Sequence, residues 1–127
     1  MSATRPQKIP GPDHPITIVP SSARVAVSVG DHVIADTTHA LELREAGYPP
    51  VHYVPLADVD ASVLLASDTT SYCPYKGEAS YYSIRGADGV VADAIWYYPA
   101  PYDAVSQIAG HVAFYPDRVQ IDEGGPS

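Results

Sequence analysis

The sequence predicts a mainly β, mostly antiparallel domain with one short helix. Residues 24–29 alternate valines with smaller side chains, which is typical of a strand with one buried face. Gly30-Asp31 is suited to a tight turn that would pair this strand with residues 32–36, and residues 86–89 suit a second hairpin turn. Residues 102–109 follow a proline and precede a glycine, as a helix often does. Strands joined by short turns therefore account for most of the chain.

The middle of the chain is less clear in its local pattern. Residues 38–45 suit either a helix or a strand, and we expect a strand because Leu41 and Leu43 alternate with charged residues. Residues 51–55 form a short strand bracketed by prolines, which favours an edge or a strand end. Residues 58–65 are short and apolar, and fit one helical turn or a strand.

The second half of the chain again favours strands. Residues 69–75 are expected to form a loop, because Pro74 interrupts ladders and Thr/Ser-rich stretches favour turns. Further strands are expected at residues 78–85, 90–98, 111–115 and 118–121.

The length of 127 residues fits one domain with one core. Residues 1–15 carry four prolines and are expected to form a flexible arm. Residues 16–122 are expected to form a single β domain, and residues 123–127 a disordered tail.

The charge balance disfavours two classes of partner. The net charge is -8, and only seven lysines and arginines are present. Nucleic acids and anionic membrane surfaces both require a basic face, so neither is an expected partner. Exposed strand edges in a small β domain are compatible with a homodimer.

The cysteine count and the N-terminal sequence indicate the cellular compartment. A single cysteine allows no disulfide within the chain and no cysteine-based zinc site. The first ten residues lack the apolar stretch of a signal peptide, and no apolar run approaches the roughly 20 residues of a membrane span. We therefore expect a soluble cytoplasmic protein.

Residues 69–83 hold most of the chemistry that the sequence suggests. They include the only cysteine, Cys73, together with Lys76 and four of the ten tyrosines, whereas the chain has one phenylalanine. A buried tyrosine hydroxyl needs a partner, so this preference predicts a polar cavity with aromatic walls rather than a plain apolar core. We expect a small-molecule ligand there.

Three residues of this segment are candidate catalytic groups. A nearby cation turns a thiol into a useful nucleophile, and Lys76 lies three residues after Cys73. Tyr72 is a candidate proton donor or acceptor. The alternatives are that Cys73 is a small buried hydrophobe and that Lys76 is a solvated loop lysine. No histidine lies beside Cys73 in the sequence to serve as a base.

Four further residues are candidate ligand contacts. Arg24 either directs its guanidinium into a pocket or decorates a sheet edge. Trp96 either forms a cavity wall beside small alanines or fills the core. Tyr75 and Tyr98 add aromatic surface near the thiol segment and near Trp96.

The sequence predicts neither a metal site nor a cofactor. The five histidines show no ligand spacing, and the Asp58–Asp60 pair is a motif that is common by chance. Residues 86–89 lack the helix and the lysine that a phosphate loop requires.

Several strings resemble the bacterial family known as domain of unknown function 427, and they run from about Arg24 to Ile121. The most specific of them is Tyr72-Cys-Pro-Tyr-Lys-Gly77. The others are Tyr53-Val-Pro55, Asp58-Val59, Ala79-Ser-Tyr-Tyr-Ser83, Ala94-Ile-Trp-Tyr-Tyr-Pro99 and Ala113-Phe-Tyr-Pro-Asp-Arg-Val119.

The resemblance implies a small β-tent (Mss4-like) domain of two sheets, a fold whose other members hold small ligands between the sheets. It carries over Arg24, Tyr72, Cys73, Lys76, Trp96 and Tyr98 as pocket residues. The family also bears a nucleotidyltransferase label, but this sequence has no Gly-Ser turn, no convincing metal carboxylates and few cations for a triphosphate.

Three functions are consistent with these observations. The first is an enzyme acting on a polar metabolite that bears a carbonyl or carboxylate, with Cys73 and Lys76 at its centre. The second is a ligand-binding or accessory domain that uses the same pocket without chemistry. The third is a structural or interaction domain whose tyrosines only pack.

Overall fold

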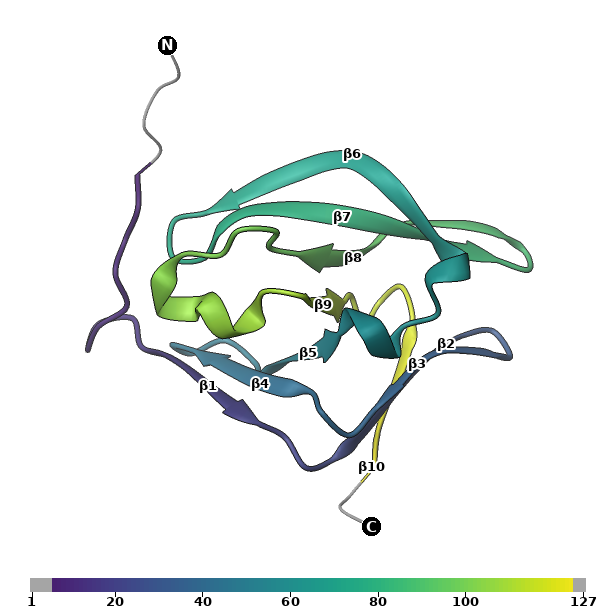
Figure 1. Cartoon of the computed structure of the whole chain (residues 1–127), viewed down its shortest axis with the longest axis horizontal. Helices are drawn as coiled ribbons and strands as arrows, with labels where there is room; N and C mark the ends of the chain where they lie inside the picture. Colours follow the sequence, from purple (N-terminus) through teal and green to yellow (C-terminus); the bar gives the residue numbers. More distant parts are fainter. Residues whose placement is uncertain (1–5, 125–127) are drawn as a thin grey trace.

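The computed structural model describes residues 6–124 and forms two antiparallel sheets (Figure 1). The larger sheet has seven strands in the order β1-β4-β5-β9-β8-β7-β6, and the smaller has the order β10-β2-β3. The expectation of a mainly β, antiparallel domain with two sheets is therefore confirmed. The strands are β1 (Ile16–Pro20), β2 (Arg24–Val29), β3 (His32–Thr37), β4 (Leu41–Glu45), β5 (Val51–Pro55), β6 (Leu64–Cys73), β7 (Gly77–Gly86), β8 (Gly89–Tyr97), β9 (His111–Phe114) and β10 (Gln120–Gly124).

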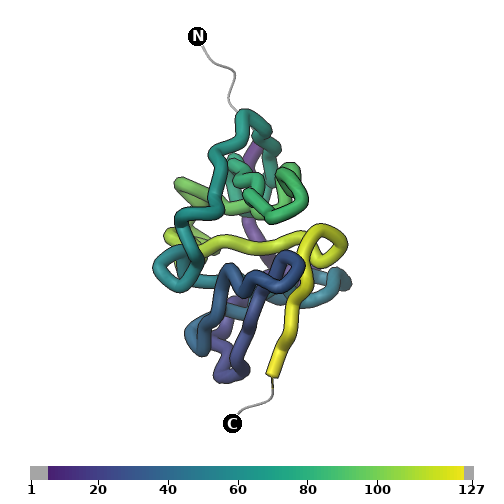
Figure 2. Tube along the Cα trace, turned by 90° about the vertical axis from the view of Figure 1, so that its right-hand side faces the viewer, coloured from purple at the N-terminus to yellow at the C-terminus, as the bar shows by residue number. Residues whose placement is uncertain are grey.

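The smaller sheet stands at one end of the molecule. Figure 2 shows the yellow β10 running alongside the blue β2–β3 hairpin, and the ladder pairs Glu123 with Val25 and Gly124 with Arg24. Glu123 and Gly124 thus lie in a strand, although the sequence assigned them to the tail. Residues 125–127 of the expected tail and residues 1–5 of the expected arm lie outside the described residues.

The ambiguous middle segments resolve into a strand and short helices. Residues 41–45 form β4, so the preference for a strand over a helix is confirmed. The region 58–65 contains the 3₁₀ turn η2 (Ala61–Val63) and then enters β6, while η1 (Leu56–Asp58) precedes it. The sequence predicted either a helical turn or a strand for residues 58–65, and the region contains part of each.

The structure corrects the expected loop at residues 69–75. Its first part belongs to β6, where Thr70 pairs with Ser80 and Cys73 with Gly77. Pro74 lies in the turn that follows, beyond the end of the ladder, so it removes no ladder hydrogen bond. Thr and Ser therefore act here as strand residues.

Strand β1 was absent from the expected elements. Ile16 and Ile18 are half-buried and alternate with exposed residues, which is a strand pattern too short to stand out between prolines. Pairing of Ile16 with Glu45 joins β1 to β4, so the residues just before β1 are carried to the end of β4.

Residues 6–15, expected as an arm, lie against the β6–β7 turn. The Lys8 amide donates to the Pro74 carbonyl at 2.9 Å, and the Tyr72 hydroxyl donates to the Pro6 carbonyl at 2.6 Å. A bridge between Gly11 and His14 turns the chain back towards β1.

Two apolar clusters make up the core. One lies between the two sheets and includes Val25, Val27, Val54 and Ile95. The other surrounds buried Tyr53 and Tyr98 on the larger sheet, with Cys73 and Trp96 packed against it. Its remaining buried members include Val105 and Ile108 of the 3₁₀ helix η3 (Asp103–Ile108), which forms where the sequence predicts a short helix. Among the described residues, no helix has the length and apolar character to cross a membrane.

Candidate functional site

The turn between β6 and β7 positions the only thiol and its neighbouring ammonium. The Lys76 amide donates to the Cys73 carbonyl at 3.2 Å and closes the turn. Gly77 follows with φ +113°, a conformation that side chains rarely adopt, and a Cβ there would meet the Ala100 carbonyl oxygen at 3.3 Å. The Tyr102 amide donates to the Lys76 carbonyl at 3.0 Å, so the turn is fixed to the start of η3.

This turn brings Cys73 and Lys76 together, as the sequence predicts. The Lys76 Nζ donates to the Cys73 Sγ at 3.7 Å. Lys76 is only 7% exposed, whereas Cys73 is half-buried. A solvated loop lysine is therefore the wrong reading of Lys76, because its ammonium is directed into the protein.

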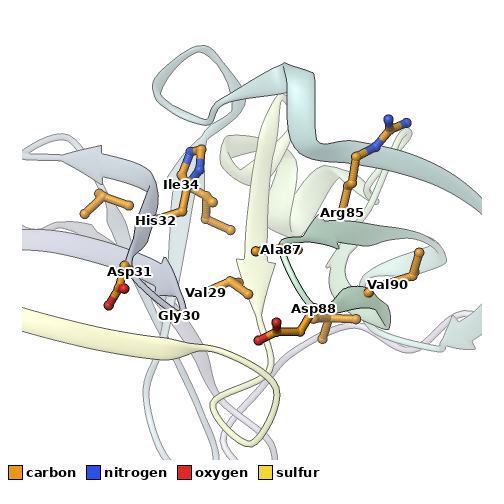
Figure 3. A pocket seen from close by; sticks show the side chains of 13 residues that line it. Val29, Gly30, Asp31, His32, Ile34, Arg85, Ala87, Asp88 and Val90 are labelled. Carbon is orange, nitrogen blue, oxygen red and sulfur yellow. The ribbon is translucent and has the colours of Figure 1, made fainter.

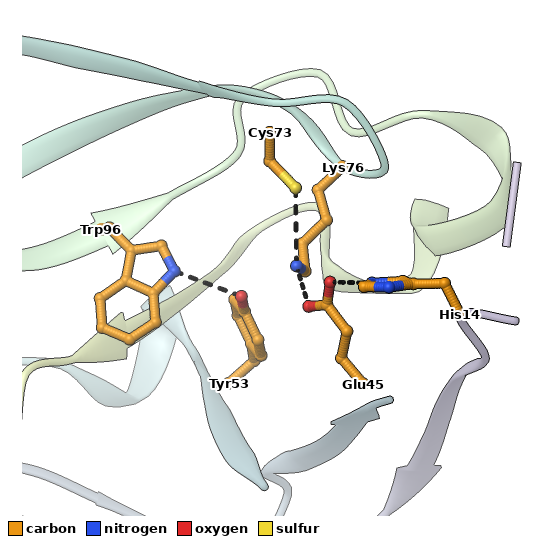
Figure 4. A network of polar contacts seen from close by, with 6 residues as sticks. All are labelled: His14, Glu45, Tyr53, Cys73, Lys76 and Trp96. Atoms are coloured by element: carbon orange, nitrogen blue, oxygen red, sulfur yellow. Dashed lines mark hydrogen bonds and ion pairs between the residues drawn. The ribbon is translucent and has the colours of Figure 1, made fainter. Parts of the chain in front are cut away.

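Glu45 and His14 complete a chain of polar contacts with this pair (Figure 4). The Lys76 ammonium forms an ion pair with Oε1 of Glu45. His14 Nε2 donates to Oε2 of the same carboxylate at 2.6 Å. The side chains of Glu45 and His14 are 14% and 23% exposed, so solvent screens these contacts little. The order His14–Glu45–Lys76–Cys73 links a titratable ring to the thiol.

The pKa of Glu45 reflects these contacts. Burial acts to raise the pKa of this carboxyl, but hydrogen bonds and charge from Lys76 and His14 outweigh burial and hold it below the usual range. Glu45 is therefore a carboxylate at neutral pH, and it fixes the position of the ammonium beside the sulfur.

Tyr75 supports the site from the side of His14. The two rings stack with centroids 4.0 Å apart and planes 6° apart, and the Lys8 ammonium lies 6.0 Å from the centroid of Tyr75. Tyr75 was predicted as a ligand contact, and the structure places it as a support that orients the His14 ring.

Tyr72 is directed elsewhere. Adjacent residues of an extended strand point to opposite faces. The Tyr72 hydroxyl lies 2.5 Å from the Tyr102 hydroxyl and donates to the carbonyl of Pro6. The predicted catalytic trio is thus not assembled, because these contacts hold Tyr72 against η3 and residues 6–15 rather than beside the thiol.

Tyr53, Trp96 and Tyr98 form the aromatic surroundings of the cluster. The Trp96 indole N–H donates to the Tyr53 hydroxyl at 3.3 Å, and the two rings meet nearly edge to face at 82°. Burial raises the pKa of both Tyr53 and Tyr98 far above the usual range, and the nearby Glu45 and Cys73 add to it. Both phenols therefore keep their protons at neutral pH and can act as hydrogen-bond donors.

Arg24 does not reach this cluster. It opens β2 in the smaller sheet, and its guanidinium makes two hydrogen bonds to Asp36, at 2.8 and 2.5 Å. Its side chain is 60% exposed. Neither sequence interpretation holds in full: β2 is the central strand of the smaller sheet, so Arg24 forms an exposed ion pair at a strand end rather than at a sheet edge. The shared cavity expected for Arg24, Cys73 and Lys76 is not formed.

Sequence inspection missed His14 and Glu45. Each lies 31 positions from its partner in the contact chain, and neither carries a motif. Only the β1–β4 ladder, which ends at the pair Ile16–Glu45, brings the residues before β1 to the thiol turn. A histidine therefore does serve this site, through a carboxylate rather than by direct contact with Cys73.

The aspartates considered as metal ligands have structural partners. Asp58 accepts a hydrogen bond from the buried Thr37 hydroxyl at 2.7 Å. Asp60 caps η2 through the Ser62 amide and lies 3.1 Å from His32. Across residues 6–124, no group of three or more His, Cys, Asp or Glu side chains could hold a metal ion.

Two cavities lie outside the thiol cluster. One, of about 950 Å³, separates the β2–β3 and β7–β8 turns, and none of the predicted site residues lines it (Figure 3). The other, of about 720 Å³, lies between the two sheets and has Trp96 in its wall. Trp96 was expected either to form a cavity wall or to fill the core, and in the structure it does both, packing against a core cluster and lining this cavity.

The family model described as Domain of unknown function (DUF427) matches residues 17–124. The chain belongs to this family. The matched region contains Glu45, Cys73, Lys76 and Trp96, whereas His14 precedes it. The comparison with curated proteins gave no match.

Proposed function

We propose that this domain is an enzyme acting on a small polar metabolite that bears a carbonyl or carboxylate, with Cys73 as nucleophile and Lys76 as its electrostatic partner. The observation that carries the proposal is the 3.7 Å contact between Nζ and Sγ, made by a lysine that is only 7% exposed. The ammonium is placed to stabilise the negative charge that develops when a cysteine sulfur attacks a substrate or a substrate oxygen takes up electrons. Cys73 is half-buried, so a small substrate can approach it.

The surrounding residues suit attack on a carbonyl. The Cys73 sulfur forms a carbon–sulfur bond as its S–H bond breaks, and the π electron pair of the carbonyl moves to the carbonyl oxygen. The thiol proton ends on this oxygen, which the Lys76 ammonium stabilises by a hydrogen bond. Glu45 holds the ammonium in place, and the hydrogen bond from His14 holds Glu45. Tyr98 belongs to the apolar cluster against which Cys73 packs, so it forms part of the wall beside the sulfur.

Alkylation of the single cysteine provides a first test. We expect iodoacetamide to modify Cys73 about tenfold faster in the wild type than in Lys76→Met, because the variant loses the positive charge beside the attacking sulfur. Lys76→Arg retains the charge and should fall between them, while Arg85→Met, which removes an exposed cation at the cavity between the β2–β3 and β7–β8 turns, should match the wild type. Mass spectrometry measures the rate, and equal rates in the wild type and Lys76→Met would contradict the proposed role of Lys76.

A metabolite screen provides the second test. Carbonyl and carboxylate metabolites are incubated with wild type, Cys73→Ser and Lys76→Met, and turnover is followed by NMR. Turnover that depends on both residues supports the proposal. Turnover that persists in Cys73→Ser removes the thiol from the mechanism.

The second candidate is a ligand-binding or accessory domain that uses the Cys73–Lys76 cluster without chemistry. The observation that favours it is that His14 acts only through Glu45, which leaves Cys73 without a direct general base. This candidate predicts saturable binding, reported by Trp96 fluorescence, with no product. A purely structural domain is less favoured, because packing alone gives no reason to bury a lysine beside a thiol.

The remaining expectations are part of the same proposal. The β-tent arrangement and the bacterial source rest on the family resemblance, and the cytoplasm suits a protein with one reduced cysteine. A small-molecule ligand, rather than nucleic acid or a membrane, suits the net charge of -8. A homodimer stays a prediction for measurement by light scattering.

A further inference from the structure

The cavity of about 720 Å³ between the two sheets has the size of a small-molecule site, for which about 300–1,000 Å³ is typical. Its apolar surface comes from the half-buried Val51, Val119 and Ile121, with core residues such as Val25 and Val54 directly beneath. Trp96 contributes the only indole of the chain to the wall. These residues come from both sheets, so the cavity exists only because the sheets meet.

Glu123 is the only Asp, Glu, Lys or Arg among the described residues that line this cavity, and it is exposed at the end of β10. His52 also lines the cavity; it lies 3.1 Å from Glu123 and 3.6 Å from Glu42, and its side chain is 15% exposed. Arg44 donates to Glu42 at 2.6 Å, so the positive charge of Arg44 is matched by Glu42. Within residues 6–124, the ion-pair partner of Glu123 is His52.

We propose that this cavity binds a small organic amine, with its apolar or aromatic body against the partly exposed Trp96, Val51 and Val119 and its ammonium at Glu123. A carboxylate at an apolar cavity favours a cationic ligand, and the described lining residues include no lysine or arginine that would favour an anionic one. An ammonium near an indole also gains from the negative face of the ring. This site is separate from the Cys73–Lys76 contact and does not depend on chemistry there.

Three probes with the same body and different charge test the proposal. Phenethylamine is cationic, 2-phenylethanol is neutral and phenylacetate is anionic. Each is titrated into the wild-type protein while Trp96 fluorescence and amide chemical shifts are followed. We expect saturable binding of phenethylamine with shifts at β2, β5 and β10, and binding of the other two that is at least about tenfold weaker.

Variants then test whether the ammonium group of phenethylamine lies at Glu123. Glu123→Gln should weaken phenethylamine binding about tenfold, while Asp88→Asn, an exposed acid that lines the other cavity, should leave it unchanged. Val119→Phe fills the cavity and should reduce the binding of all three probes. If Val119→Phe does not fold, Glu123→Gln decides, because Glu123 is exposed and its removal leaves the core intact.

The outcomes separate this site from the proposed enzyme. Cys73→Ser should bind phenethylamine as the wild type does. No saturable change up to about 10 mM, which corresponds to less than about 3 kcal/mol of binding, overturns the proposal. Equal binding of the three probes, or equal binding by wild type and Glu123→Gln, overturns the choice of an amine.

Discussion

Lys76–Glu45 and Arg24–Asp36 are two cation–carboxylate pairs with opposite surroundings. The Lys76 and Glu45 side chains are 9% and 14% exposed, and they adjoin the thiol. Those of Arg24 and Asp36 are 60% and 45% exposed, on the smaller sheet. An exposed pair is screened by water, whereas a buried pair depends strongly on the presence of both partners. In the sequence, both cations are equally good candidates for ligand binding. The structure separates them by burial, because only the Lys76–Glu45 pair is shielded from water.

The largest expected effect comes from breaking the buried pair. Lys76→Met leaves the Glu45 carboxylate with His14 alone, and we expect the free energy of unfolding to fall by about 3 kcal/mol. The double variant Lys76→Met/Glu45→Leu should recover much of that loss, because no unpaired charge remains. Urea denaturation measures both. A double variant as unstable as the single one would show that packing, rather than charge, dominates at this site.

The pH dependence of stability provides a second contrast. The folded-state pKa of Glu45 is lowered, so its contribution is present above the ordinary pKa of about 4.3 and is lost as pH falls through the folded-state value. We expect the stability difference between wild type and Glu45→Gln to be full near pH 7 and to shrink below about pH 4.3.

Asp36→Asn is the matched control for this measurement. The hydrogen bond from Arg24 lowers the pKa of Asp36 as well, but this carboxyl is exposed. Its pH dependence should have the same sign and a smaller amplitude. A larger amplitude for Asp36 than for Glu45 would reverse the contrast between the two pairs.

Loss of a buried hydrogen bond between neutral groups should lower the free energy of unfolding less than loss of the buried ion pair. Tyr53→Phe removes the acceptor of the Trp96 indole N–H, and we expect a loss of about 1 kcal/mol with a shift in tryptophan emission. Thermal unfolding and fluorescence measure these effects. Unchanged emission would mean that the indole N–H finds another acceptor.

Breaking the exposed pair should have the smallest effect. Arg24→Met removes both hydrogen bonds to Asp36, yet we expect the denaturation midpoint and the alkylation rate of Cys73 to match those of the wild type. A slower alkylation rate in this variant would connect Arg24 to the thiol after all.

Local patterns predicted most of the strands. The valine alternation of β2 and the glycine turns at residues 30–31 and 86–89 act through nearest neighbours, so they can be read directly. The error at residues 69–73 had a local cause too. Thr and Ser favour turns in isolation, but pairing with β7 extends them into a strand, and such pairing is a property of the sheet.

The site could be predicted only in part. Cys73 and Lys76 are three residues apart across one turn, and their contact requires little besides that turn. Tyr72 illustrates the limit, because proximity in sequence did not place its hydroxyl beside the thiol. Tyr75 was found by its position in the segment, but its role as a support for His14 depends on where residues 6–15 lie.

The sequence by itself determined the β class, the acidic charge and the closeness of one thiol to one ammonium, because periodicity, composition and a short turn are local properties. Only the tertiary structure decided that Glu45 and His14 join this pair, that Arg24 stays at the surface, and that a cavity opens beside Trp96. Those outcomes depend on the register of β1 against β4 and on how the two sheets pack. Register and packing depend on how the whole core is buried, so they cannot be predicted from any single segment of the sequence.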